Sequence, residues 1–201
     1  MSQPSVTYEF TWPFKINVQR TQLTEEQFGL LCQENPELRL ELTAQGELII
    51  MPPTGPEGGW RSGETFLSLG TWAKQDGTGL SFDSSTGFTL PNGAIRSPDA
   101  SWMRRERWTA LTKAQRVKFA PICPDFVVEV RSQTDKLSDL LEKMQEYIDN
   151  GARLGWLIDP LEQHVYIYRP GRPVEVQDNP SSVSGDPELP GFVLHVRELW
   201  E

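Results

Sequence analysis

The sequence predicts a mixed α/β domain of the α+β type, with a central mixed sheet flanked by helices. Two features carry this prediction. An apolar run at residues 126–130 is followed by an amphipathic helix at 135–150 and a second apolar run at 154–158, which is the order of a β-α-β unit. Before this unit come an N-terminal helix and a β-hairpin, so the predicted domain combines both kinds of element around one sheet.

The N-terminal helix is predicted from a capping box. Thr24 is followed three positions later by Gln27, and each side chain of this motif can bond the other residue's backbone. The helix extends to about residue 33 and ends before Pro36, which disfavours helical backbone at the preceding residue. Residues 1–20 carry no comparable signal, and we expect them to form a loose N-terminal segment.

Short strands and a long helix follow. Leucines alternate with charged residues at 38–42, and a Gln-Gly turn leads into an apolar strand at 48–51, so the two predict a hairpin. A loop rich in proline and glycine at 52–59 precedes a predicted helix at 60–74. Further short strands are expected at 80–82, 88–90, 95–103, 165–168 and 192–194.

Composition excludes several classes of protein. The chain has 201 residues and is 37% hydrophobic, values typical of one globular domain, so we assign residues 1–201 to a single domain. Cys32 and Cys123 lie in no CxxC motif, which argues against a disulfide scaffold or a cysteine zinc site. The sequence contains neither an apolar run long enough for a membrane span nor a secretory leader, so a cytoplasmic location is expected.

Charge is unevenly distributed along the chain. The formal net charge is −9, which argues against unspecific binding of nucleic acid by the whole surface. Residues 101–120, however, contain six basic residues and one acidic residue, so this segment carries +5 and the remainder −14. Such a patch can meet a phosphate backbone, but a solvated helical connection is the more common use of a charge run, and we favour that interpretation.

Two carboxylates are candidates for a shared site. Asp99 follows Pro98 within the strand predicted at 95–103, and Glu129 lies within the strongest apolar strand. Because side chains alternate along a strand, Val127, Glu129 and Arg131 share one face. A buried carboxylate without a partner is strongly unfavourable. Glu129 therefore needs a cation, which can be a metal ion, a lysine or Arg131.

Lys143 is the third candidate residue. It borders the apolar stripe of the predicted helix at 135–150, and its ammonium can reach the strand end that carries Glu129 if this helix packs back on the sheet. Two acids and a lysine suit phosphodiester hydrolysis. The acids offer the oxygen ligands that Mg²⁺ prefers, and the lysine can orient a water or stabilise charge on the phosphorus centre.

Each candidate also has a purely structural interpretation. Asp99 can cap nearby backbone amides, as acids after proline often do. Glu129 can pair with Arg131 as a structural ion pair, and Lys143 can pair with Asp139 one turn earlier on its helix. Spacing alone favours these structural interpretations, because many acids and lysines satisfy so loose a pattern.

Several motifs extend in order over residues 23–200. They are Arg39-Leu40-Glu41-Leu42, Pro98-Asp99-Ala100-Ser101-Trp102, the strand from Pro124 to Glu129, Lys143 with Tyr147, Trp156-Leu157-Ile158-Asp159-Pro160, and Leu189-Pro190-Gly191-Phe192. In this combination the chain resembles the Uma-two family of restriction-endonuclease-like proteins, which are abundant in cyanobacteria.

The resemblance implies the PD-(D/E)XK nuclease fold, a restriction-endonuclease-like core with metal-binding acids on adjacent strands. By position, it makes Asp99 and Glu129 the metal-binding carboxylates and Lys143 the catalytic lysine, displaced to the following helix. The usual lysine of this superfamily stands two residues after the glutamate, where this chain has Arg131. Arginine supplies only charge and hydrogen bonds, because it does not deprotonate. Asp125 is expected to shape the beginning of its strand.

A fourth acid often joins such sites from the helix after the Pro-Gly loop. Glu64 is our first candidate for this acid and Glu57 the second. For Glu64, a solvated position on the helix is the slightly favoured alternative. The cofactor that the resemblance implies is Mg²⁺, with Mn²⁺ as a substitute.

The leading hypothesis is therefore a Mg²⁺-dependent endonuclease that hydrolyses DNA phosphodiester bonds. The alternative is a catalytically inactive binding or assembly module that keeps the nuclease fold. A hydrolase acting on other substrates is a weaker hypothesis, because the sequence has no GxSxG motif. A homodimer is expected, since cleavage of two DNA strands usually needs two sites and two-fold pairing is common.

Overall fold

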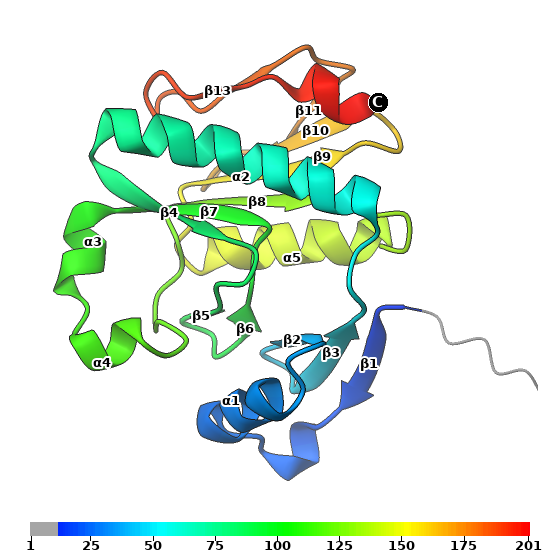
Figure 1. Cartoon of the computed structure of the whole chain (residues 1–201), viewed down its shortest axis with the longest axis vertical. Coiled ribbons are helices and arrows are strands. Elements are labelled where there is room, and N and C mark those ends of the chain that lie inside the picture. The colour runs from blue at the N-terminus through cyan, green and yellow to red at the C-terminus, as the bar shows by residue number, and fades with distance from the viewer. Residues whose placement is uncertain (1–11) are drawn as a thin grey trace, which may run out of the picture.

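The computed structural model describes residues 12–201 and is built around a six-stranded sheet (Figure 1). Its strands run in the order β11-β10-β9-β8-β7-β4. In that order they span Glu175–Asp178, His164–Tyr168, Leu154–Asp159, Phe126–Val130, Ala100–Arg104 and Gly79–Asp83. Neighbouring strands are antiparallel except β8 and β9, which are parallel. The predicted mixed sheet is therefore confirmed.

Two helices cover the two faces of this sheet. Helix α2, Pro56–Asp76, lies on one face, and helix α5, Leu137–Asp149, lies on the other (Figure 1). Helix α5 connects β8 to β9, which is the connection that parallel neighbours require. The β-α-β unit expected from the two apolar runs is present, and every residue of β8 and β9 is buried.

The predicted N-terminal hairpin belongs to a second sheet. Its five strands run in the order β1-β3-β2-β6-β5 and are antiparallel. In that order they span Phe14–Asn17, Glu47–Met51, Arg39–Leu42, Ile95–Arg96 and Phe88–Thr89. Helix α1, Glu25–Glu34, begins at the predicted capping box and buries Phe28 against Leu42, Leu48 and Ile95 of this sheet.

The expectation of a loose segment at residues 1–20 is wrong for the part that the structure describes. Strand β1 pairs with β3, with Phe14 opposite Ile50, and a short 3-10 helix, η1, follows at Gln19–Thr21. Residues 14–17 alternate apolar and polar, which is the pattern of a strand, but four residues are too few to predict one without knowledge of the partner strand. Residues 1–11 lie outside the described part of the chain.

Two other boundaries differ from the expectation. The strand predicted at 95–103 is divided into β6 and β7, which belong to different sheets. The break falls at Pro98, whose backbone lacks the N–H that a continuous ladder needs. Helix α2 begins at Pro56, ahead of the predicted start at residue 60, because proline is well accommodated in a first helical turn.

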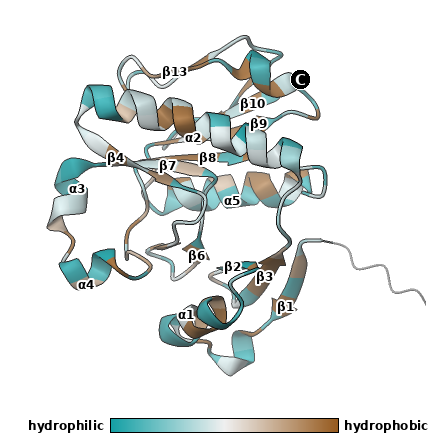
Figure 2. Cartoon of the chain, viewed as in Figure 1, coloured by the Kyte–Doolittle hydropathy of each residue, from teal (hydrophilic) through white to brown (hydrophobic). Residues whose placement is uncertain are grey.

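The core has a layer on each side of the main sheet. On the α2 side, Phe126 and Trp156 pack with Phe192, and the rings of Trp156 and Phe192 are stacked 5.5 Å apart. On the α5 side, Val127 and Leu157 pack with Met144, Tyr147 and Ile148 of the helix. Figure 2 shows hydrophobic segments on β8, between α2 and α5, and both hydrophobic and hydrophilic segments on these two helices.

The remaining elements are short. Helices α3, Arg105–Ala110, and α4, Lys113–Arg116, follow β7, as predicted for the basic segment. Strands β12, Val183–Ser184, and β13, Val193–Leu194, form a hairpin near the final 3-10 helix η2, Val196–Trp200. Within residues 12–201, none of the helices has the length and apolar character needed to cross a membrane.

Candidate functional site

Asp99 and Glu129 come together because of the register between β7 and β8. Ala100 pairs with Val128 in this antiparallel ladder, so Asp99, one residue before β7, comes opposite Glu129. Residues opposite each other across such a ladder present their side chains on the same face. Both carboxylates line one cavity of about 290 Å³, and Oδ2 of Asp99 accepts a hydrogen bond from the Val130 N–H at 2.9 Å.

Lys143 reaches this pair from helix α5. Its Nζ lies 2.8 Å from Oε1 of Glu129. The hydroxyl of Tyr147, one turn further along the helix, donates to the same oxygen at 2.9 Å. The alternative pairing of Lys143 with Asp139 does not occur, because Asp139 is bound by Lys15 at 2.7 Å. The ammonium of Lys143 therefore lies at the end of β8, beside Glu129.

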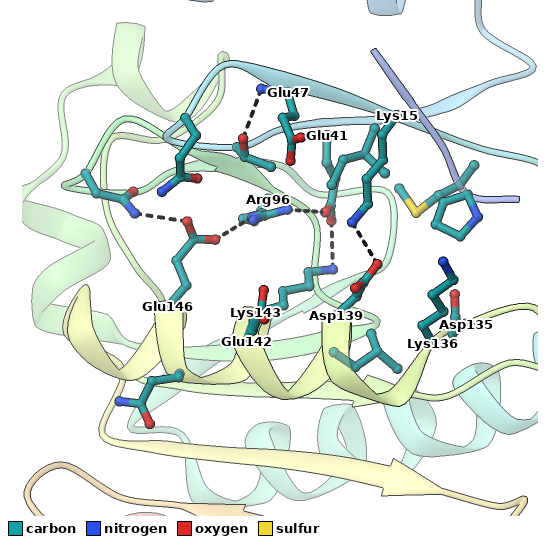
Figure 3. A pocket seen from close by; sticks show the side chains of 18 of the residues that line it. Lys15, Glu41, Glu47, Arg96, Asp135, Lys136, Asp139, Glu142, Lys143 and Glu146 are labelled. Carbon is teal, nitrogen blue, oxygen red and sulfur yellow. Dashed lines mark hydrogen bonds and ion pairs between the residues drawn. The ribbon is translucent and has the colours of Figure 1, made fainter. Parts of the chain in front are cut away.

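Glu41 of strand β2 is a third buried carboxylate at this place. Its Oε1 lies 2.8 Å from Nζ of Lys143, and its Oε2 lies 3.0 Å from Nη1 of Arg96 (Figure 3). Arg96 also binds Glu146 of α5 at 2.6 Å. The second sheet and α5 are thus joined by a continuous network of buried charges.

Glu41 and Arg96 were not among the residues expected from the sequence. The available signal was the alternation in β2, which places Arg39 and Glu41 together on its polar face. That pattern does not tell whether a polar face meets solvent or another element. Here it meets α5, and Glu41 is only 2% exposed.

The two glutamates that share Lys143 have opposite pKa shifts. Burial alone would raise the pKa of Glu41, but the cations of Lys143 and Arg96 outweigh it and lower that pKa to about 2. Burial likewise raises the pKa of Glu129, and Lys143 opposes this effect only in part. Because Asp99 and Glu41 add negative charge nearby, the pKa of Glu129 is raised to about 7.

Asp99 is also held above its ordinary pKa. Burial is the main cause, and Arg39, whose Nη2 lies 3.7 Å from Oδ1 of Asp99, compensates it only in part. Burial would lower the pKa of Lys143, but Glu129 and Glu41 raise it, so the lysine is a cation at neutral pH. In its present state Lys143 is a hydrogen-bond donor and a positive charge.

This carboxylate pair fits a hard divalent cation. Asp99 and Glu129 line the same cavity, and burial raises the pKa of both, an effect that Arg39 and Lys143 oppose only in part. Within residues 12–201, no set of three His, Cys, Asp or Glu side chains is placed to hold a metal. Magnesium is commonly held by only one or two carboxylates, with water and substrate phosphate as its other ligands.

The comparison with known proteins agrees with the motifs found in the sequence. The model of the Uma2 family, described as "Putative restriction endonuclease", matches residues 25–197. The chain belongs to the Uma2 family. The resemblance inferred from the motifs is thereby confirmed.

The fold of this Uma2 chain is also found in a solved structure. The chain is similar to an Anabaena variabilis protein described as "a putative nuclease belonging to DUF820", with a TM-score of 0.72 and 23% sequence identity. The similarity covers 88% of this chain and 97% of that chain, and at this identity it shows the fold. Among curated proteins, no match to the chain is found.

Of the two acids predicted on α2 as candidates for the site, the structure places Glu57, and not Glu64, at the cavity. Glu57 lines the cavity that contains Asp99 and Glu129, whereas Glu64 lines neither this cavity nor the larger one beside it. The reason is distance along the helix, because Glu64 stands seven residues, or about 10 Å, beyond Glu57. Glu57 itself is bound by Arg61 at 2.6 Å.

Arg131 and Asp125 have structural contacts. Nη1 of Arg131 lies 2.7 Å from Oδ2 of Asp159 at the end of β9, so it does not pair with Glu129. Asp125 accepts a hydrogen bond from the Arg104 N–H at 2.9 Å and lies 3.0 Å from Nη1 of Arg107. Asp125 thus fixes the beginning of β8, as expected.

The basic segment of this Uma2 chain lies away from the carboxylate pair. Strand β7 starts beside Asp99 and ends where α3 begins, so α3 and α4 stand at the opposite end of the sheet from the start of α5 (Figure 1). Several of its cations have local partners. Arg107 binds Asp125, and the guanidinium of Arg116 lies 5.0 Å from the ring centroid of Trp108. These contacts agree with the favoured interpretation of a solvated helical connection.

Proposed function

We propose that this Uma2 chain is a Mg²⁺-dependent endonuclease that hydrolyses DNA phosphodiester bonds, with Mn²⁺ as a substitute ion. The observation that carries the proposal is the meeting of Asp99 and Glu129 across β7 and β8, with Nζ of Lys143 2.8 Å from Glu129. Restriction-endonuclease-like proteins generally use divalent metals, which supports the choice of cofactor.

Asp99 and Glu129 would hold the metal ion, and their side chains offer the oxygen ligands that it prefers. When bound, Mg²⁺ supplies Lewis acidity toward a phosphate oxygen and makes water a stronger nucleophile. Lys143 contributes a fixed positive charge and hydrogen-bond donors, which stabilise the negative charge that develops on the phosphate during hydrolysis. Tyr147 orients Glu129 through the hydrogen bond from its hydroxyl.

The test is plasmid nicking in the presence of Mg²⁺ or Mn²⁺. Wild type is compared with Asp99→Asn, Glu129→Gln and Lys143→Met, and with Glu142→Gln as a matched control on an exposed position of α5. We expect wild type and the control to nick DNA and the three site variants to lose at least about 100-fold in rate, the scale of losing a preorganised charge-stabilising group. Equal rates in all five proteins would remove the proposal.

The alternative function is a metal-free binding or assembly module with the nuclease fold. One observation favours it, namely that the ammonium of Lys143 pairs with two carboxylates, Glu41 and Glu129, as in a structural ion-pair network. Titration with Mn²⁺ followed by calorimetry separates the two functions. If the chain is an endonuclease, wild type binds Mn²⁺ and the Asp99→Asn, Glu129→Gln double variant does not. If the chain is a binding module, neither protein shows a heat of binding.

A homodimer is part of the proposal, because cutting both strands of a duplex calls for two sites. Sedimentation of the wild-type chain checks this point. A monomer that makes only single-strand nicks would contradict the dimer and leave the single-site chemistry in place.

A further inference from the structure

Lys143 is shared equally between two carboxylates that come from different sheets. Its Nζ lies 2.8 Å from Oε1 of Glu129, on β8 of the main sheet, and 2.8 Å from Oε1 of Glu41, on β2 of the second sheet. The Lys143 and Glu41 side chains are 11% and 3% exposed. Both residues line the cavity of about 290 Å³ and also a neighbouring cavity of about 600 Å³, so the pair is common to the two. Figure 3 shows the pair in the larger cavity.

Glu41 is held by other residues as well as by Lys143. Its Oε1 also accepts a hydrogen bond from the Ser97 N–H at 3.0 Å, and its Oε2 is bound by Arg96 at 3.0 Å. Arg96 is fixed in turn by Glu146 at 2.6 Å. Glu41 therefore keeps two partners, Ser97 and Arg96, in addition to Lys143.

The two acceptors of Lys143 differ in what a metal ion would do to them. A divalent cation bound by Glu129 would repel the ammonium beside it and compete for the same carboxylate. Glu41 belongs to another sheet than Glu129, and the carboxylate opposite Glu129 in the β7–β8 ladder is Asp99. Glu41, as a second acceptor, would keep the Lys143 ammonium next to the cavity when Glu129 binds the metal ion.

On the basis of the proposed function, we infer that Glu41 is a positioning residue, which holds the Lys143 ammonium at the cavity while Glu129 binds the metal ion. The N-terminal sheet then completes the active site of the main sheet. Glu41 touches neither metal nor phosphate in this arrangement and acts only through Lys143. A purely structural role for the pair, joining β2 to α5, predicts the same contacts but no response to metal.

The experiment measures how fast Lys143 is acetylated by acetic anhydride, with and without saturating Mn²⁺, by mass spectrometry of the peptide that contains it. The proteins are full-length wild type, Glu41→Gln, Glu41→Asp and Glu146→Gln. The last is the matched control, because Glu146 belongs to the same buried network but contacts Arg96 instead of Lys143. Calorimetry gives the Mn²⁺ affinity of each protein, and circular dichroism checks its fold.

We expect Mn²⁺ to leave Lys143 protected in wild type and in Glu146→Gln. In Glu41→Gln, Mn²⁺ should increase the acetylation rate of Lys143 about tenfold, the scale of losing one hydrogen bond to a charged group. Glu41→Asp, which keeps the charge on a shorter side chain, should be intermediate, and it decides the question if Glu41→Gln does not fold.

The possible failures are distinguishable. If wild type binds Mn²⁺ but Lys143 stays equally protected in the Glu41 variants, the positioning role is overturned and the proposed function stands. The positioning role is also overturned if Mn²⁺ increases the acetylation of Lys143 in Glu146→Gln as much as in Glu41→Gln. The effect would then come from the loss of any negative charge in the network, and not from the contact between Glu41 and Lys143. If wild type binds no Mn²⁺, the proposed function fails and the inference fails with it.

Discussion

Nη1 of Arg131 lies 2.7 Å from Oδ2 of Asp159, whose side chain is completely buried at the end of β9. Asp159 also accepts hydrogen bonds from the N–H groups of Leu161 and Glu162, at 3.0 and 3.3 Å. Position 131, where the resemblance to PD-(D/E)XK nucleases predicts a lysine, is thus used here to neutralise a buried acid of the neighbouring strand. Arg131 is therefore a structural residue at the rim of the cavity.

Replacing Arg131 should affect stability more than metal binding. Arg131→Met leaves Asp159 as a buried charge without its cation, and we expect a loss of about 3 kcal/mol in the free energy of unfolding, measured with urea. Lys15→Met, which breaks the half-exposed pair with Asp139, is the control and should cost less than about 1 kcal/mol. A large loss of Mn²⁺ affinity in Arg131→Met at constant stability would contradict this assignment.

Metal binding should depend on pH near neutrality. The pKa of Glu129 is raised to about 7, chiefly by burial, so its carboxylate is protonated in a growing fraction of molecules below that pH. Because Mn²⁺ needs the deprotonated form, its affinity should fall about tenfold per pH unit below the pKa and level off above it. Calorimetric titrations with Mn²⁺ from about pH 5.5 to about pH 8.5, on both sides of the Glu129 pKa, check this pH dependence of the affinity. Glu129→Gln should show no such slope.

The metal-free protein should gain stability as the solution is acidified toward pH 4.5. The folded-state pKa of Glu129 is raised to about 7 from the ordinary 4.5, so the folded protein binds the proton more tightly than the unfolded chain does. The cost of burying the charged form is present above pH 7 and is relieved as the pH falls. Urea unfolding of wild type and Glu129→Gln should therefore converge on acidification, and a constant difference between them would contradict the shift.

Glu41 should have the opposite effect at lower pH. Its pKa is lowered to about 2 because Lys143 and Arg96 outweigh the effect of burial. Its stabilisation is fully present above its ordinary pKa of 4.5 and is lost as the pH falls toward 2. Glu41→Gln should cost about 3 kcal/mol at pH 7, and this difference from wild type should shrink below pH 4.5. The contrary result is a stability difference between wild type and Glu41→Gln that is as large at about pH 3 as at about pH 7.

Two glycines of the main sheet should respond differently to alanine. A Cβ at Gly79 would collide with the Trp102 ring and the carbonyl oxygen of Met103, whereas a Cβ at Gly155 would lie 2.6 Å from the terminal methyl of Met144. Backbone and a packed ring cannot give way, but a methionine end can. Gly79→Ala should therefore destabilise by about 2 kcal/mol more than Gly155→Ala, as measured by urea unfolding.

The sequence predicted the regular elements well where the pattern is local. The capping box of Thr24 and Gln27 starts α1, and the apolar stripe around Met144 and Ile148 forms α5. Periodicity and caps are properties of a few neighbouring residues, so the sequence displays them directly. Strand β1 and the division of the predicted strand at Pro98 were missed, because both depend on which distant strand supplies the hydrogen bonds.

The candidate site was predicted in part. The motifs pointed to Asp99, Glu129 and Lys143, and the structure brings these three side chains together. Their roles in metal binding and catalysis stay predictions. Glu57 rather than Glu64 lines the cavity, because helix α2 starts earlier than the sequence indicated and its first turn is the part that reaches the site.

By itself, the sequence determined the helices and strands that have a strong local pattern, the family, and the pairs of residues that share a strand face. Only the tertiary structure decided which charges meet. Glu41 stands 102 positions from Lys143, yet the two lie 2.8 Å apart. A buried charge must find a partner wherever the fold provides one, and that choice depends on how two sheets and a helix pack, which no local pattern of residues records.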